Sequence, residues 1–262
     1  GGFIWPGVDY LGEAGWPSKG WPNGLFDICM FEKPRAAYHR AMWNPEPMVR
    51  IAVKDPFADI DHGRDLWQWP SIVDHWNFDG KFNGLVIEVL TTTNCEEVEL
   101  YRNDKLMGRE RAANYTNNTI VWNIPYTPGT LLAKGYNQGK EVAKWEIKTA
   151  GVPASLKAEA DRMEIAADGQ DLSHISLTLV DKNGVKVQTD NRRISVKVSG
   201  EGRLKALDTG DLRVDSFCRD NVLTYFGQAL LTVQSTRKAG NIRADIQVEG
   251  IDKPFSVMIT TK

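Results

Sequence analysis

The chain has 262 residues, of which 42% are hydrophobic and 25% are charged. At about 150 residues per domain this length predicts two domains, and the composition excludes a disordered tail, a collagen-like repeat and a disulfide-stapled mini-protein. Lysine and arginine total 32 against 34 acidic residues, so the net charge is -2. A balance this even gives no chain-wide attraction to nucleic acid or to an anionic membrane surface, and we expect neither as a partner.

The first segment, residues 1–45, contains one short apolar run, one long loop and one helix. The loop is rich in Gly, Pro and Trp, and apolar residues three and four apart predict a helix over 34–43. Pro34 suits the first helical position because the N–H that proline lacks would be unpaired there. These elements cannot bury a core of their own. We expect the segment either to be partly disordered or to pack on the domain that follows.

The second segment, residues 46–149, consists of short alternating runs with turn residues every eight to twelve positions. This spacing is typical of an antiparallel immunoglobulin-like β-sandwich. Asn103-Asp104 between two runs indicates a hairpin. The stretch from Lys54 to Gly84 is too long for a plain connection and predicts a functional or packed loop. The strands are expected at 48–53, 85–90, 98–101, 106–107, 119–124, 130–136 and 142–147.

The third segment, residues 150–262, repeats this pattern, with Asp168-Gly169 and Asn183-Gly184 as turn signals. Its seven short runs predict a second immunoglobulin-like β-sandwich. The predicted fold class is therefore mainly β, with two tandem sandwiches after residues 1–45. The strands are expected at 155–160, 163–166, 175–180, 194–198, 229–233, 242–248 and 255–259.

Cysteine and acidic patterns indicate neither a disulfide framework nor a metal site. The three cysteines are far apart and odd in number, which is atypical of a disulfide scaffold. Part of a calcium loop would have the spacing of Asp59, Asp61, Gly63 and Asp65, but the glutamate that such a loop needs is missing. We expect no metal and no cofactor.

Tryptophan is unusually frequent, with nine residues in the chain. Trp67, Trp69 and Trp76 form the densest aromatic cluster, within the long loop of the second segment. They could form a platform that stacks on carbohydrate, or a hydrophobic plug that packs the loop onto a neighbouring domain. Large aromatic side chains are more often core than ligand contacts, so the plug is the favoured interpretation.

An ordered set of motifs runs along the chain: Gly1–Tyr10, Leu11-Gly12-Glu13, His75-Trp76-Asn77, Glu97–Tyr101, Tyr126–Gly129 and Ala167–Leu172. Together these motifs resemble the C-terminal portion of glycoside hydrolase family two, in its bacterial β-galactosidase branch. The resemblance covers nearly the whole chain. It implies that residues 1–45 are the remnant of the C-terminal end of a catalytic (β/α)₈ barrel, its last strand and helix, and that the two later segments are the sandwiches that follow the barrel.

The same resemblance implies where substrate binds. Active sites of such barrels lie at the C-terminal ends of the strands, so Trp5 is expected to line the sugar subsite and to stack on the C–H face of the ring. Asp9 and Glu13 follow it, and we expect them to orient the loop through hydrogen bonds. The candidate substrate-binding residues are Trp5, Asp9, Trp16, Trp69 and Trp76.

The resemblance also implies that the catalytic residues lie elsewhere. Retaining glycosidases use two carboxyl groups about 5 Å apart, and in this family both are glutamates on earlier barrel strands. We therefore assign no catalytic residue here. The chain, which begins without Met, is expected to be a fragment cut from a longer protein.

The predicted function is that of a C-terminal fragment of a retaining, β-galactosidase-like glycoside hydrolase, inactive by itself, whose parent hydrolyses terminal non-reducing β-D-galactose. β-Glucuronidase is the rival parent. A different class, a non-catalytic carbohydrate-binding or adhesive module, is the alternative. Expected partners are the carbohydrate substrate and the remainder of the barrel, in a bacterial periplasmic or secreted protein. The oligomeric state stays open.

Overall fold

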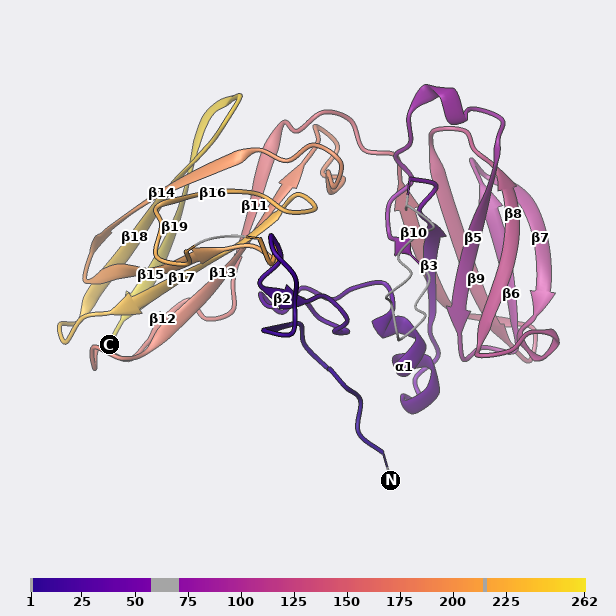
Figure 1. The fold of residues 1–262 in the computed structure, drawn as a ribbon, viewed down its shortest axis with the longest axis horizontal. Helices are drawn as coiled ribbons and strands as arrows, with labels where there is room; N and C mark the ends of the chain where they lie inside the picture. Colours follow the sequence, from indigo (N-terminus) through magenta and orange to yellow (C-terminus); the bar gives the residue numbers. More distant parts are fainter. Residues whose placement is uncertain (1, 58–70, 214–215) are drawn as a thin grey trace. The chain divides into compact units, whose positions relative to one another are not determined.

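A computed structural model describes residues 2–57, 71–213 and 216–262 of the chain. Two compact units make up the structure (Figure 1). One unit is Glu32–Thr149, and the other joins Gly1–Phe31 to Ala150–Lys262. No helix within the described parts of the chain is long and apolar enough to cross a membrane.

The unit Glu32–Thr149 contains two four-stranded antiparallel sheets, ordered β4-β3-β5-β8 and β10-β9-β6-β7. We call this unit the first sandwich, since side chains from both sheets share one core. Its strands are β3 (Val49–Lys54), β4 (Ile72–Val73), β5 (Val86–Thr93), β6 (Glu97–Arg102), β7 (Lys105–Arg111), β8 (Thr119–Pro125), β9 (Thr130–Asn137) and β10 (Lys140–Lys148), with single 3₁₀ turns η1 (Gly80–Phe82) and η2 (Ala112–Asn114).

Strict alternation explains why these strands form. In β8, Ile120, Trp122 and Ile124 are buried, whereas the residues between them face outward. Side chains on a strand point alternately to opposite faces, so each such run buries one face only. The turn at Asn103-Asp104 has φ of 47° and 63°, the left-handed conformation that a two-residue hairpin loop requires.

Helix α1 (Ala36–Trp43) belongs to the first sandwich and matches the helix expected over 34–43. Arg50 on β3 is only 7% exposed, and its guanidinium lies 2.5 Å from Glu32 and 3.3 Å from Asp74. The same group stacks 4.7 Å above the ring of Trp145. Glu32 also pairs with Arg40 of α1 at 2.5 Å. A buried cation thus ties the segment that leads into α1 to the sheet.

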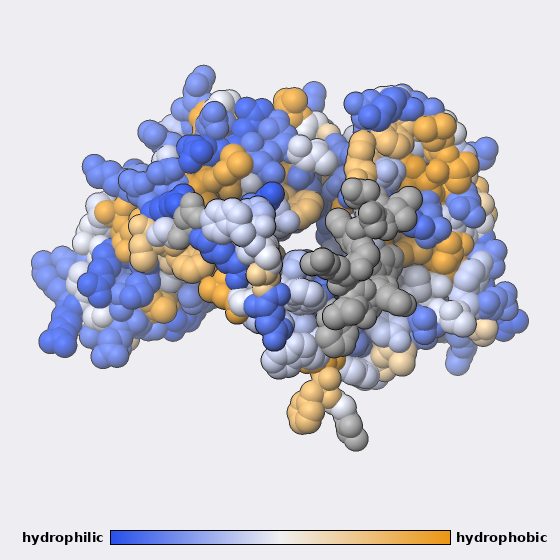
Figure 2. Space-filling model, in the orientation of Figure 1, coloured by the Kyte–Doolittle hydropathy of each residue, from blue (hydrophilic) through white to orange (hydrophobic). Residues whose placement is uncertain are grey.

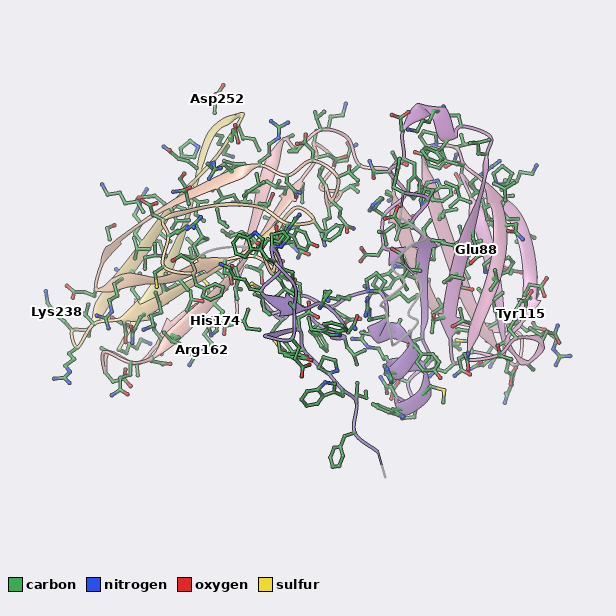
Figure 3. The ribbon with its side chains drawn as sticks, viewed as in Figure 1. Glu88, Tyr115, Arg162, His174, Lys238 and Asp252 are labelled. Carbon is green, nitrogen blue, oxygen red and sulfur yellow. The ribbon has the colours of Figure 1, made fainter. Side chains whose placement is uncertain are left out.

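Replacement of Arg50 by Met should lower the free energy of unfolding by about 2–3 kcal/mol, because it removes a buried cation from between two carboxylates. Urea denaturation of the chain measures this. Lys54→Met is the matched control on the same strand: Lys54 is 56% exposed, and its pair with Glu88 on the outer sheet face (Figure 3) is 3.6 Å long. Exposed pairs contribute about 0–1 kcal/mol, so equal losses in the two variants would contradict the assignment.

In the other unit, the apolar core is formed by residues of Ala150–Lys262. We call Ala150–Lys262 the second sandwich. Its sheets are ordered β11-β13-β17-β15 and β12-β19-β18-β14-β16, and they enclose a single apolar core. Gly169 and Gly184 occupy positive φ of 80° and 78°, as the turn signals predicted. The strands are β11 (Ser155–Ala160), β12 (Glu164–Ile165), β13 (Leu172–Val180), β14 (Arg193–Gly200), β15 (Gly202–Asp208), β16 (Asn221–Leu223), β17 (Gln228–Ser235), β18 (Gly240–Val248) and β19 (Ile251–Thr261).

The apolar run at residues 3–5 forms no strand, although the resemblance implied the last barrel strand within residues 1–45. The regular structure of residues 2–31 is a two-stranded sheet of β1 (Tyr10–Leu11) and β2 (Gly20–Trp21), with a parallel bridge between Val8 and Phe26. Residues 1–45 were expected either to be partly disordered or to pack on residues 46–149. Packing on that sandwich holds only from Glu32 onward, because Gly1–Phe31 belong to the unit of the second sandwich. The reason is the outer face of β15 and β17, which offers Ala206 and Leu230 to them.

Candidate functional site

The candidate substrate-binding residues lie in different parts of the structure. Trp5, Asp9 and Trp16 belong to the unit of the second sandwich, and Trp76 belongs to the first sandwich. Trp69, together with its neighbour Trp67, lies outside the described residues. Each described candidate therefore has to be judged from its own surroundings.

Trp76 is fully buried in the core of the first sandwich. Its indole N–H donates to the carbonyl oxygen of Thr127 at 2.8 Å, and its ring meets Tyr126 edge to face at 4.9 Å. A ring with no exposed surface cannot stack on a sugar in this fold. The burial of Trp76 favours its interpretation as a packing residue, and its position gives no support to its assignment as a substrate-binding residue.

Trp5 has the opposite character, with 66% of its surface exposed. Its ring is braced by Tyr10, with ring centroids 5.6 Å apart. The Tyr10 hydroxyl donates to the Glu13 carboxylate, and this hydrogen bond raises the pKa of Tyr10. Apolar atoms also gather at the projecting N-terminal end of the chain (Figure 2), where Phe3 is fully exposed. Trp5 thus offers an open, supported aromatic face of the kind that binds the C–H side of a sugar.

Asp9 is buried, with 5% of its surface exposed. Its carboxylate accepts a hydrogen bond of 2.7 Å from the backbone N–H of Gly24, while its own N–H donates to the Phe26 carbonyl oxygen at 2.9 Å. A Cβ on Gly24 would lie 2.3 Å from the Asp9 nitrogen, so only glycine fits there. These bonds orient the chain between residues 9 and 26, which is the loop-orienting role that the sequence favours for this carboxylate.

Asp27 is a second carboxylate that accepts hydrogen bonds from backbone N–H groups of this segment, and it was not singled out from the sequence. Its Oδ1 accepts from the backbone N–H groups of Cys29 at 2.8 Å and Phe31 at 3.0 Å. Aspartate side chains often bond the backbone two residues on, so the signal was present but could not be told from ordinary turn chemistry.

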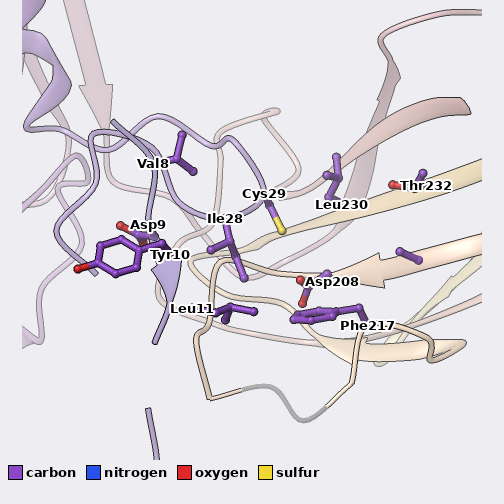
Figure 4. Close-up of a pocket in the computed structure, with 11 residues that line it drawn as sticks. Val8, Asp9, Tyr10, Leu11, Ile28, Cys29, Asp208, Phe217, Leu230 and Thr232 are labelled. Carbon is purple, nitrogen blue, oxygen red and sulfur yellow. The ribbon is translucent and has the colours of Figure 1, made fainter. Parts of the chain in front are cut away.

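A cavity of about 410 Å³ lies between this segment and the outer face of the second sandwich (Figure 4). Burial, together with the nearby carboxylates of Asp27 and Asp211, raises the pKa of Asp208 to about 6. Burial also raises the pKa of the Cys29 thiol, so Cys29 stays protonated and unreactive. The cavity is lined by Val8, Asp9, Tyr10, Leu11, Ile28, Cys29, Ala206, Asp208, Phe217, Leu230 and Thr232.

Within the described parts of the chain, no group of three His, Cys, Asp or Glu side chains could hold a metal ion. Around Trp5, the chain provides the aromatic face of the indole, the phenol of Tyr10 and the carboxylate of Glu13. Such a set can bind and orient a polyhydroxylated ring, because hydroxyl groups need hydrogen-bond partners and the C–H face of the ring needs apolar contact.

Asp208→Asn should stabilise the unit of the second sandwich at pH 7.5 and leave it unchanged at pH 4. The folded state raises the pKa of this carboxyl from 3.8 to about 6. The fold therefore holds the proton more tightly than the unfolded chain does, and stability is lost as the pH rises through that interval. Thermal denaturation at the two pH values measures the effect, expected as a gain of a few degrees at pH 7.5. The exposed Asp252 (Figure 3) provides the control variant, Asp252→Asn. Equal shifts at both pH values would contradict the assignment.

Comparison with known proteins agrees with this architecture. Residues 156–254 match the family model of glycoside hydrolase family 2 C-terminal domain 5, and residues 84–143 match a domain of unknown function, DUF4982. A solved glycosyl hydrolase family 2 member from Bacteroides cellulosilyticus superposes with a TM-score of 0.91 and 31% identity, over 99% of this chain and 36% of that one.

The chain corresponds to a C-terminal portion of glycoside hydrolase family 2. The resemblance seen in the sequence is thereby confirmed, and so is the mainly β fold.

Two curated relatives are named as glycosidases. A β-galactosidase of Bacteroides ovatus is 26% identical over 257 residues, which is 96% of this chain and 27% of the relative. A putative β-glucuronidase of Formosa agariphila is 26% identical over 217 residues, which is 80% of this chain and 19% of the relative. The chain thus spans well under half of the length of the proteins it matches.

Proposed function

We propose that the chain is the C-terminal part of a retaining glycoside hydrolase that removes terminal non-reducing β-D-galactose from β-D-galactosides. The observation that carries this proposal is the exposed ring of Trp5, which Tyr10 and Glu13 brace in a family 2 portion related to a β-galactosidase. In this proposal, residues 1–45 are the C-terminal end of the catalytic barrel, in which residues 3–5 would pair as the last strand only beside the rest of the barrel, and the two sandwiches are of immunoglobulin type.

The described carboxylates of the first segment support a non-catalytic role for the chain alone. Asp9 is buried and bonded to the Gly24 backbone, and Glu13 accepts from Tyr10. Retention requires a nucleophile and an acid/base about 5 Å apart on opposite sides of the scissile bond. We propose that both catalytic carboxyls come from a longer polypeptide of which this chain is one part, and that the chain contributes binding rather than bond cleavage.

Each residue near Trp5 then has a physical task. The indole face covers the C–H side of the terminal sugar and excludes water from it. Tyr10 fixes the tilt of the indole, and Glu13 fixes Tyr10 through its carboxylate. A ring held in place before the substrate arrives loses little conformational entropy on binding, which favours the orientation that the catalytic groups need.

The alternative of a carbohydrate-binding module rested on the cluster of Trp67, Trp69 and Trp76. Trp76 is in the core, so no described residue of that cluster favours the alternative. The rival parent activity, β-glucuronidase, has the support of the relative from Formosa agariphila. The substrate of the assay below distinguishes the two.

The chain alone should release no p-nitrophenol from p-nitrophenyl β-D-galactoside or β-D-glucuronide, whereas the polypeptide extended upstream through its reading frame should hydrolyse the galactoside. In the extended protein, Trp5→Ala should lower kcat/KM by about 10–100-fold, which corresponds to about 1.4–2.7 kcal/mol of lost contact.

Trp43→Ala is the matched control, because Trp43 is 67% exposed and lies on α1 of the first sandwich. It should change kcat/KM by less than twofold. Hydrolysis by the chain alone would overturn the non-catalytic role. Preference of the extended protein for the glucuronide would replace the galactosidase assignment, and equal losses in both tryptophan variants would remove Trp5 from the sugar site.

A further inference from the structure

The loop that carries Trp16 is a hairpin too small to hold its own shape. We call residues 10–21 the Trp16 loop. Its two strands, β1 and β2, have two residues each and pair Tyr10 with Trp21 and Leu11 with Gly20. One further backbone bond, from Gly12 to Lys19 at 2.7 Å, extends the pairing. An isolated hairpin is marginally stable at best in water, so the conformation of this loop has to be set from outside it.

The second sandwich supplies that support through Leu212. The backbone N–H of Lys19 donates to the Leu212 carbonyl oxygen at 3.0 Å. The Leu212 side chain is 7% exposed, and its Cδ2 lies 2.9 Å from where a Cβ on Gly20 would be. That Cβ would also lie 2.4 Å from the Tyr10 carbonyl oxygen. Leu212 therefore meets the hairpin both through its backbone and through close packing on a glycine.

Gly210, two residues earlier, meets the other end of the same segment. A Cβ on Gly210 would lie 2.1 Å from Asp27 Oδ2, so the Asp27 carboxylate lies directly against the Gly210 backbone. The other oxygen of Asp27 holds the turn that ends at Phe31. The loop after β15 thus contacts both the hairpin and the turn that follows it.

Residues 209–213 of this loop are hydrogen-bonded to one another. The Asp211 carboxylate accepts two hydrogen bonds from the Arg213 guanidinium, at 2.8 and 2.9 Å. Thr209 is fully buried and its hydroxyl accepts from the Asp211 backbone N–H at 3.3 Å. These bonds hold the backbone of residues 209–213 in a turn, from which Leu212 contacts the hairpin.

We propose that Leu212 is a positioning residue through which the second sandwich sets the conformation of the Trp16 loop and the presentation of Trp16 to carbohydrate, and that Gly210 positions the Asp27 turn that follows this loop. Trp16 is 82% exposed, so the position of its ring follows the conformation of the backbone that carries it. The clause on carbohydrate rests on the proposed function, whereas the clause on loop conformation does not.

Amide hydrogen exchange by NMR on the chain tests the loop clause. Leu212→Ala should speed exchange of the Gly12 and Lys19 amides by at least about tenfold and change the Leu231 amide in β17 by less than threefold. Leu204→Ala is the matched control, because Leu204 packs on the core of the same sandwich. It should speed exchange in β17 without singling out the hairpin. Unchanged protection of Gly12 and Lys19 in Leu212→Ala would overturn the proposal.

A double variant tests Gly210 separately. Gly210→Ala should speed exchange at Cys29 and Phe31, since the new methyl displaces Asp27. Asp27→Gly removes the displaced group, so the double variant should exchange no faster than Asp27→Gly alone. Additive effects of the two substitutions would show that Gly210 acts elsewhere and would remove it from the proposal.

Kinetics of the extended protein test the carbohydrate clause. Leu212→Ala should raise KM for the galactoside about 5–10-fold and leave kcat within twofold, and it should have no further effect when Trp16 is already Ala. A merely structural loss would lower apparent kcat at constant KM, and that result would overturn the clause. If the exchange result holds while the extended protein is inactive on both glycosides, the proposed function fails and the positioning of the loop stands.

Discussion

The second sandwich provides the apolar surface on which residues 2–31 fold. This segment has two strands of two residues each and cannot enclose a core. It therefore lies on the outer face of the sheet that contains β15 and β17, where Leu230 and Ala206 are available. The same segment holds the buried carboxylates of Asp9 and Asp27, whose hydrogen bonds to backbone N–H groups are strengthened where water is excluded.

Local physics was enough to predict most of the β structure. In β8 and β9 the burial pattern follows the alternation of the sequence, and left-handed turns occur at Asn103-Asp104 and Gly184. Helix α1 was predictable because Pro34 precedes it and an extended Asn44 ends it. Strand β15 was missed for a physical reason. A bulge after Leu204 shifts its register, so that apolar residues face inward at an odd spacing that breaks the expected alternation.

The candidate site was predictable only in part. Trp5 and Trp76 are the same residue type, yet one is exposed and the other has no exposed surface. What separates them is long-range packing against Tyr126 and Thr127, some fifty positions away. Likewise, Asp208 and Leu212 come close to residues 8–29 through tertiary structure alone, and no local pattern could have paired them.

The three cysteines differ in a way that makes the chain chemically addressable. Cys29 and Cys95 are buried, and Cys218 is exposed. Cys218 directly follows Phe217, which lines the cavity beside Asp208. A thiol-reactive fluorophore would therefore attach to the native chain at a single place, without any engineered cysteine. The emission of this fluorophore would depend on the polarity of its surroundings, beside the contact between the N-terminal segment and the second sandwich. A change in emission would therefore follow attachment or release of that segment in real time.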